Sequence, residues 1–138
     1  MIPRHLLTAL TYLGEKEIEG EKDNPIIARF LASVGIVGHD EIPWCAAFVN
    51  YCLMDAGMHG TNLGLAKSYL TWGRECGCEA GAVAIMNRGS DPRQGHVAFV
   101  VQDCGSYCIT VGGNQSDAVT LAIVNKTKII SYRRTVWI

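Results

Sequence analysis

A cysteine stands at the start of an apolar segment with helical spacing, in Pro43-Trp44-Cys45-Ala46-Ala47-Phe48-Val49-Asn50. This pattern predicts that Cys45 lies at the N-terminus of a helix. The unpaired backbone N–H groups and the positive dipole end of a helix favour a thiolate over a thiol, and they lower a cysteine pKa from its usual value of about 8.5. Cys45 is therefore a candidate nucleophile.

A thiol nucleophile needs a proton acceptor, and His96 is the histidine that we expect on a rigid element. It opens a segment in which apolar residues alternate, at 97, 99 and 101, which predicts a strand that aims the imidazole ring. His39 is the rival base because it lies close to Cys45 in the sequence, but it belongs to an acidic loop. We therefore expect His96 to be the general base.

A third polar group that orients the imidazole is expected after a later predicted strand, in Val111-Gly112-Gly113-Asn114-Gln115-Ser116. Asn114 is the first candidate, although asparagine also suits a turn that follows two glycines. Gln115 and Asp117 are the alternatives. A cysteine, a histidine and an amide in this order indicate nucleophilic cleavage of an acyl bond through a thioester.

The elements that must position these residues change in character along the chain. Helices are predicted first, over residues 3–14, from 25 to Gly35 or Gly38, over 44–54 and over 66–72. Short strands follow, over 82–86, 96–102, 107–111, 119–124 and 128–133. The order predicts an α+β fold in which N-terminal helices pack on a five-stranded, mostly antiparallel sheet.

Composition limits the class of protein. The 138 residues carry a formal net charge of −1, 49% are apolar and 18% are charged, which suits one domain over residues 1–138. The net charge argues against nucleic acid as a partner, and no apolar segment approaches the roughly 20 residues that insert into a membrane. The first residues do not have the pattern of a signal peptide, so we expect the protein to be made in the cytoplasm.

Six cysteines are many for a chain of this length. Five of them are Cys52, Cys76, Cys78, Cys104 and Cys108. Most are expected to be buried or idle thiols. A disulfide between Cys104 and Cys108, or between that hairpin and Cys76 or Cys78, is the alternative. A zinc site built from the last four has spacings unlike those of common zinc ribbons.

Several motifs occur in one order: PWCAAFVN, AKSYLTWG, GAVAIM, GHVAFVV, VGGNQSD and SYRR. From Leu6 to Arg134 the chain resembles the CHAP and NlpC/P60-like peptidoglycan hydrolases, and within them a compact bacterial and phage subgroup with P-W-C, G-H-V and G-G-N-Q-S motifs. The resemblance implies a papain-like α+β fold that cleaves amide bonds of cell-wall peptides with Cys45 as nucleophile, His96 as base and Asn114 as third member. Many NlpC/P60 enzymes have a second histidine as third member, and this chain has Asn114-Gln115 there.

We further expect five residues to contact the substrate: Trp44, Lys67, Ser68, Trp72 and Gln115. Trp72 has the alternative of being a core residue, because it follows Tyr69 at helical spacing. The backbone N–H of Cys45 and a neighbouring donor are expected to bind the oxyanion. No metal or cofactor is expected, because the thiolate itself supplies the nucleophile.

The expected function is hydrolysis of peptidoglycan at an amide bond, as an amidase or an endopeptidase. A phage endolysin and a secreted antibacterial effector fit equally, and an effector would have an immunity protein as its partner. Either would act in the periplasm or the cell wall, as a monomer. A non-catalytic module of the same fold that binds the wall or a partner is the alternative.

Overall fold

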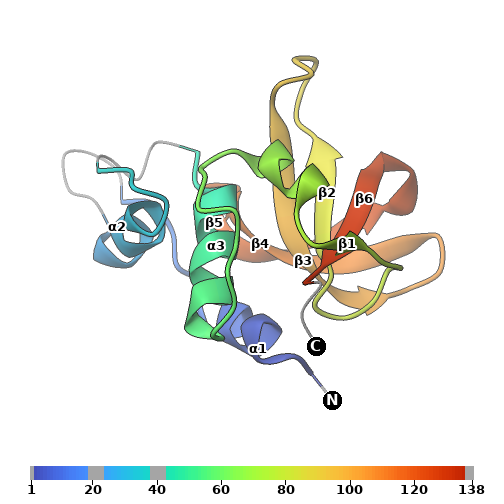
Figure 1. Ribbon diagram of the computed structural model, residues 1–138, viewed down its shortest axis with the longest axis horizontal. Helices are drawn as coiled ribbons and strands as arrows, with labels where there is room; N and C mark the ends of the chain where they lie inside the picture. The colour runs from blue at the N-terminus through green and yellow to red at the C-terminus, as the bar shows by residue number, and fades with distance from the viewer. Residues whose placement is uncertain (1, 19–23, 38–42, 136–138) are drawn as a thin grey trace.

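The computed structural model of the protein describes residues 2–18, 24–37 and 43–135. Three α-helices, α1 (Arg4–Thr11), α2 (Pro25–Ala32) and α3 (Cys45–Asp55), come first and lie together beside the sheet (Figure 1). The start of α2 follows from its sequence: Pro25 occupies the first turn, and the Asn24 side chain accepts a hydrogen bond of 2.8 Å from the backbone N–H of Ile26. Within the described segments, no helix has the length and apolar character to cross a membrane.

A 3₁₀ helix follows α3, and the strands of a single sheet come after it. The 3₁₀ helix η1 (Ala66–Thr71) precedes strands β1 (Arg74–Glu75), β2 (Val83–Asn87), β3 (Gly95–Asp103), β4 (Tyr107–Gln115), β5 (Ala118–Asn125) and β6 (Ile129–Arg134), with the 3₁₀ turn η2 (Lys126–Lys128) before β6. In the part of the chain that the structure describes, the sheet has six strands in the order β1-β6-β2-β3-β4-β5. Every neighbouring pair is antiparallel.

The α+β architecture expected from the sequence is confirmed, with one strand more than the five expected. The extra strand, β1, contains only two residues, and it pairs through its backbone with the end of β6, Arg74 opposite Arg134. Two residues are too short a segment to show the alternation of apolar and polar side chains that predicts a strand.

Helix α3 forms the centre of the main core. Eight of its eleven residues are buried, so it is enclosed by α1 and α2 on one side and by β3 and β4 on the other. The ring of Phe48 lies 5.1 Å from that of Phe30, centroid to centroid, and Trp44 lies 6.0 Å from Phe30. Close packing around α3 fixes where its first residue, Cys45, is presented to the sheet.

A second, smaller apolar cluster covers the opposite face of the sheet. Along β2, Val83 and Ile85 belong to the main core, whereas Ala84 and Met86 belong to this second cluster, as alternation along a strand requires. Cys76, Cys78 and Cys108 are part of it. All six cysteines of the chain are free thiols in the structure. Burial is the main cause that raises the pKa of Cys108 to about 11, as expected for an idle thiol.

Candidate active site

Cys45 is the first residue of α3, and Trp44 is its N-cap residue. The first intrahelical hydrogen bond runs from the Phe48 backbone N–H to the Trp44 carbonyl, at 2.9 Å. The Cys45 side chain is therefore at the end of the helix where unpaired N–H groups and the positive dipole end favour an anion. Only 4% of its surface is exposed, so the sulfur lies at the bottom of a cleft.

His96, the second residue of β3, brings its imidazole to the Cys45 sulfur. Its backbone is fixed by pairing with Met86 on β2. The two side chains are close enough for each to act on the pKa of the other. The structure thus joins the candidate nucleophile and the candidate base, which are 51 positions apart in the sequence (96 − 45).

The contact between Cys45 and His96 changes the proton affinity of both groups. Burial of Cys45 disfavours the thiolate, but the hydrogen bond and charge of His96, a backbone hydrogen bond from Val97 and the charge of Arg88 together lower the pKa of Cys45. Burial of His96 disfavours the imidazolium, but the hydrogen bond and charge of Cys45, followed by the hydrogen bond to Gln115, raise the pKa of His96. Both directions favour a thiolate–imidazolium pair.

Gln115, the last residue of β4, holds the imidazole from its other side. Its Oε1 atom lies 2.9 Å from His96 Nε2. Its amide nitrogen donates to the backbone carbonyl of Thr120 at 2.9 Å and contacts the hydroxyl of the same residue at 3.0 Å. Because a carbonyl only accepts, the nitrogen of the amide must face Thr120, and the oxygen must face His96.

This orientation of the amide determines which proton His96 carries. An amide oxygen accepts, so His96 Nε2 must be the protonated donor. Nδ1 is then the ring nitrogen left for the Cys45 thiol, and in the neutral ring it is the atom that accepts a proton. The arrangement is that of a nucleophile, a base and a residue that orients the base.

Asn114, the expected third member, does not occupy this position. It lies in a β-bulge of β4, where two residues, Gly113 and Asn114, stand between Gly112 and Gln115, which pair with Thr120 and Ala118 of β5. Its φ of 58° is in the left-handed region that asparagine tolerates. Adjacent residues of a strand point in different directions, and here Gln115 reaches the imidazole. Asp117, the other alternative, is exposed in the turn before β5.

The two tryptophans expected to bind substrate lie elsewhere. Trp44 is completely buried in the main core against Phe30, so no ligand reaches it. The Trp72 indole donates to the His59 carbonyl at 2.9 Å, and the ring lines a hollow of about 800 Å³ whose lining does not include the residues of the cleft around Cys45. A tryptophan next to a reactive cysteine in the sequence can still point inward, because successive residues of a helix face different sides.

Lys67 and Ser68, on η1, are engaged with the protein itself. The Lys67 ammonium group donates to the Asn87 side chain at 2.7 Å and to the Pro92 carbonyl, so it ties η1 to the β2–β3 loop. The Ser68 hydroxyl lies 2.7 Å from that of Thr61 and 2.6 Å from the Leu65 carbonyl. Both side chains therefore support the walls of the cleft around Cys45.

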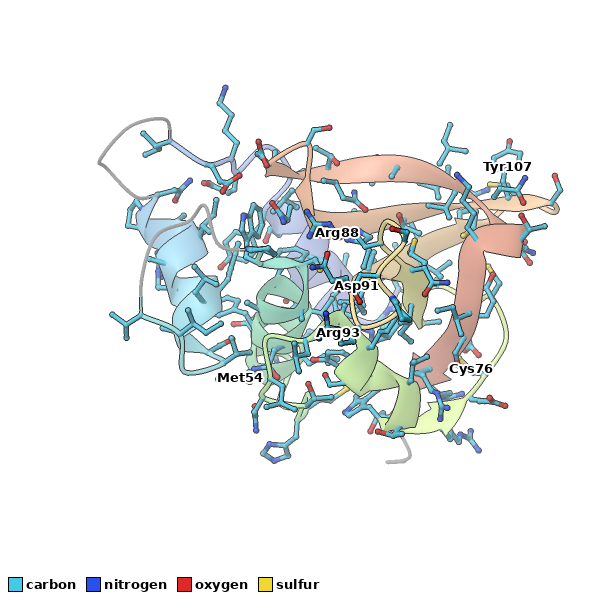
Figure 2. The ribbon with its side chains drawn as sticks, turned by 90° about the horizontal axis from the view of Figure 1, so that it is seen from above. Met54, Cys76, Arg88, Asp91, Arg93 and Tyr107 are labelled. Carbon is cyan, nitrogen blue, oxygen red and sulfur yellow. The ribbon has the colours of Figure 1, made fainter. Side chains whose placement is uncertain are left out.

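The cleft above Cys45 has a volume of about 330 Å³. Its described lining is mostly apolar or glycine, and its only charged members are two arginines of the β2–β3 loop, Arg88 and Arg93. Figure 2 shows both of them, with Asp91, on that loop. Neither arginine belongs to a motif of the sequence; the signal that points to them is their place in the loop directly before the His96 strand.

His39, the rival base, lies outside the described residues. The zinc site considered as an alternative would be built from Cys76, Cys78, Cys104 and Cys108, all of which belong to the described residues. Among these, no group of three or more histidine, cysteine, aspartate or glutamate side chains is arranged to hold a metal ion.

Comparisons with known proteins identify the family of the chain. The family model of the CHAP domain matches residues 37–114, more than half of the chain. A solved structure of a protein described as similar to a lipoprotein of the NLP/P60 family, from Staphylococcus aureus subsp. aureus Mu50, is similar with a TM-score of 0.49 and 12% sequence identity. That match covers 84% of this chain and 43% of the staphylococcal one, so the chain spans less than half of that protein. No curated protein matches the sequence.

Proposed function

Because this chain belongs to the CHAP domain family, we propose that it hydrolyses an amide bond in the peptide part of peptidoglycan through a covalent cysteine intermediate. The family match supports hydrolysis of peptidoglycan in general. The observation that carries the cysteine mechanism is the chain of contacts from Cys45 through His96 to Gln115.

In the proposed reaction, the Cys45 thiolate attacks the carbonyl carbon of the scissile amide. The negative charge that develops on the carbonyl oxygen is stabilised by the backbone N–H of Cys45 at the start of α3. His96, as imidazolium, gives its Nδ1 proton to the leaving amine, and a thioester remains on Cys45. Neutral His96 then takes a proton from water, and the resulting hydroxide attacks the thioester, which releases the carboxylic acid and regenerates the Cys45 thiolate beside the His96 imidazolium.

Gln115 acts on this reaction through His96. Its amide oxygen accepts from Nε2 in both protonation states, so Nδ1 stays directed at the sulfur and the substrate throughout the cycle. Thr120 contributes by preventing the amide from turning over. These two residues are positioning residues in the proposal, and Cys45 and His96 are the catalytic ones.

The experiment that tests the proposal is digestion of purified peptidoglycan by the wild-type protein and by Cys45→Ala, with the products identified by mass spectrometry. We expect soluble fragments from the wild type only, and their masses reveal whether the enzyme is an amidase or an endopeptidase. Absence of fragments from folded, reduced wild-type protein would contradict the proposal and favour a non-catalytic module that binds the wall.

We propose further that the enzyme meets its substrate in the periplasm or cell wall, as a phage endolysin or a secreted antibacterial effector. Expression in a bacterial host with and without an added export signal tests this. Lysis is expected only when wild-type protein is exported, and Cys45→Ala is the matched control. For an effector, co-expression of an immunity protein should prevent the lysis.

A further inference from the structure

One positive charge near Cys45 has no role in the steps above. Arg88 directly follows β2 and lines the same cleft as Cys45. Its charge acts on the pKa of both Cys45 and His96, as expected of a cation that lines the cleft of Cys45. The side chain is exposed, and it forms no ion pair within the described segments of the chain.

The other cation of the cleft differs in this respect. Arg93 is held by Asp91, with one hydrogen bond from Nε and one from Nη2, both 3.2 Å long. This paired geometry occupies two of the five N–H donors of the guanidinium and gives its charge a carboxylate partner. Arg88 is therefore the cation of the cleft that is available to a ligand.

The loop that carries Arg88 is anchored at both ends. The Arg88 backbone N–H donates to the Gln94 carbonyl at 3.4 Å, which closes the loop. Lys67 binds Asn87 on one side of the loop and Pro92 on the other. The guanidinium thus extends from a supported backbone, which reduces the conformational entropy lost when a ligand binds.

We propose that Arg88 binds a carboxylate of the substrate peptide, beside the amide bond that Cys45 attacks. This inference rests on the proposed function, because it takes the substrate to be a peptide. A planar guanidinium forms two parallel hydrogen bonds with a carboxylate, and the described lining of the cleft contains no acidic residue that would compete or repel. The preferred substrate is therefore a peptide with a free carboxyl group near the scissile bond.

The test uses two probes: a peptidoglycan stem peptide with its carboxyl groups free, and the same peptide with those groups converted to primary amides. Hydrolysis of both by the wild type, Arg88→Gln, Arg88→Lys and Arg74→Gln gives a ratio of kcat/KM values for each protein. Arg74→Gln is the matched control, because it removes one positive charge from the exposed strand β1, whose residues are not among those of the cleft.

We expect the wild type and Arg74→Gln to prefer the free peptide by about 10- to 100-fold, as for a charged hydrogen-bonded pair. Arg88→Gln should lose the preference, and Arg88→Lys should keep part of it because lysine retains the charge without the planar geometry. Equal hydrolysis of both peptides by the wild type would overturn the inference. So would an equal loss on both peptides in Arg88→Gln, since Arg88 would then act on the thiolate alone.

A binding measurement separates failure of this inference from failure of the proposed function. If the wild type cleaves neither peptide, the proposed hydrolysis is contradicted, and calorimetric binding of both peptides to Cys45→Ala decides the subsite. Tighter binding of the free peptide that is lost in Cys45→Ala/Arg88→Gln would support the carboxylate subsite. Equal binding of the two peptides, or no binding of either, would overturn the inference of a carboxylate subsite.

Discussion

At the scale of single residues, the site depends on a balance between burial and specific contacts. Cys45 is buried and His96 is half-buried, and burial alone would favour the neutral form of each. Their mutual contact, supported by Gln115 and by the Val97 backbone, reverses that tendency. The contact between Cys45 and His96 favours the charged form of each, so removing one partner changes the pKa of the other.

The lowered pKa of Cys45 predicts its reactivity. The rate of alkylation by iodoacetamide should follow the thiolate fraction, with a midpoint at lower pH than for an ordinary cysteine. In His96→Ala the midpoint should move to higher pH, because the hydrogen bond and charge that favour the thiolate are lost while burial remains. Mass spectrometry of the labelled peptide measures the rate at Cys45 alone. Identical midpoints in the two proteins would contradict this account.

Substitution of Gln115 and substitution of Asn114 should have different effects on the pH profile of hydrolysis. The hydrogen bond from His96 to Gln115 raises the pKa of His96, so Gln115→Ala should lower that pKa and move the alkaline limb of the kcat/KM profile to lower pH. A loss of about 10- to 100-fold in kcat/KM is expected for one orienting hydrogen bond to a charged group.

Asn114→Gly is the matched control for Gln115→Ala, because glycine retains the left-handed backbone at φ 58°. We expect its pH profile to be unchanged. A larger loss in Asn114→Gly than in Gln115→Ala, with a shifted alkaline limb, would instead favour Asn114 as the residue that orients His96.

At the scale of elements, the contact between β4 and α3 explains the two glycines of the Gly112-Gly113 motif. A Cβ atom at Gly113 would lie 2.6 Å from the Trp44 ring and 2.8 Å from Phe48 Cβ. A Cβ atom at Gly112 would lie 2.9 Å from Gln115 Oε1. The glycines thus let β4 approach the helix that carries Cys45 and leave space for the amide that holds His96.

Gly113→Ala should therefore destabilise the protein, because neither buried aromatic side chain has room to move. Overpacking of this kind costs about 1–3 kcal/mol in the free energy of unfolding, measured by urea denaturation. Gly77→Ala is the control: its Cβ would meet no atom within 4 Å, and no change is expected beyond about 0.5 kcal/mol. Equal stability of the two variants would mean that β4 can shift away from α3.

At the scale of the whole molecule, the fold brings together residues of the site that are far apart in the sequence. Cys45 comes from the central helix, and His96 and Gln115 come from neighbouring strands of the sheet. Figure 1 shows α3 between α2 and the strands, with α1 at the lower end of α3. The geometry of the site therefore depends on the packing of α3 against the sheet.

Phe48→Ala tests this dependence, because Phe48 is fully buried on α3 between the helices and β4. The truncation should lower the free energy of unfolding by about 3–5 kcal/mol, measured by urea denaturation. Met54→Ala on the same helix is the control, since Met54 is 47% exposed and its loss should cost far less. A small effect of Phe48→Ala on the free energy of unfolding would show that the packing of α3 contributes little to stability.

Local patterns in the sequence predicted the order of helices and strands, and they singled out Cys45 and His96 as candidate partners. Helical spacing, strand alternation and the placement of a cysteine at a helix start are properties of neighbouring residues, and they predicted the α+β fold that the structure confirms. They also predicted a third polar residue near 114, without deciding between Asn114, Gln115 and Asp117.

Tertiary structure decided which side chain contacts His96 and which residues line the cleft. Both depend on strand register and on contacts between residues that are distant in the sequence. The β-bulge in β4 determines that Gln115 reaches His96, and Thr120 on the next strand determines how its amide is turned. Burial of Trp44 and the engagement of Lys67 with the β2–β3 loop likewise come from packing. No local pattern encodes which side chains meet across a sheet, and for that reason Arg88 became visible as a cleft residue only in the folded chain.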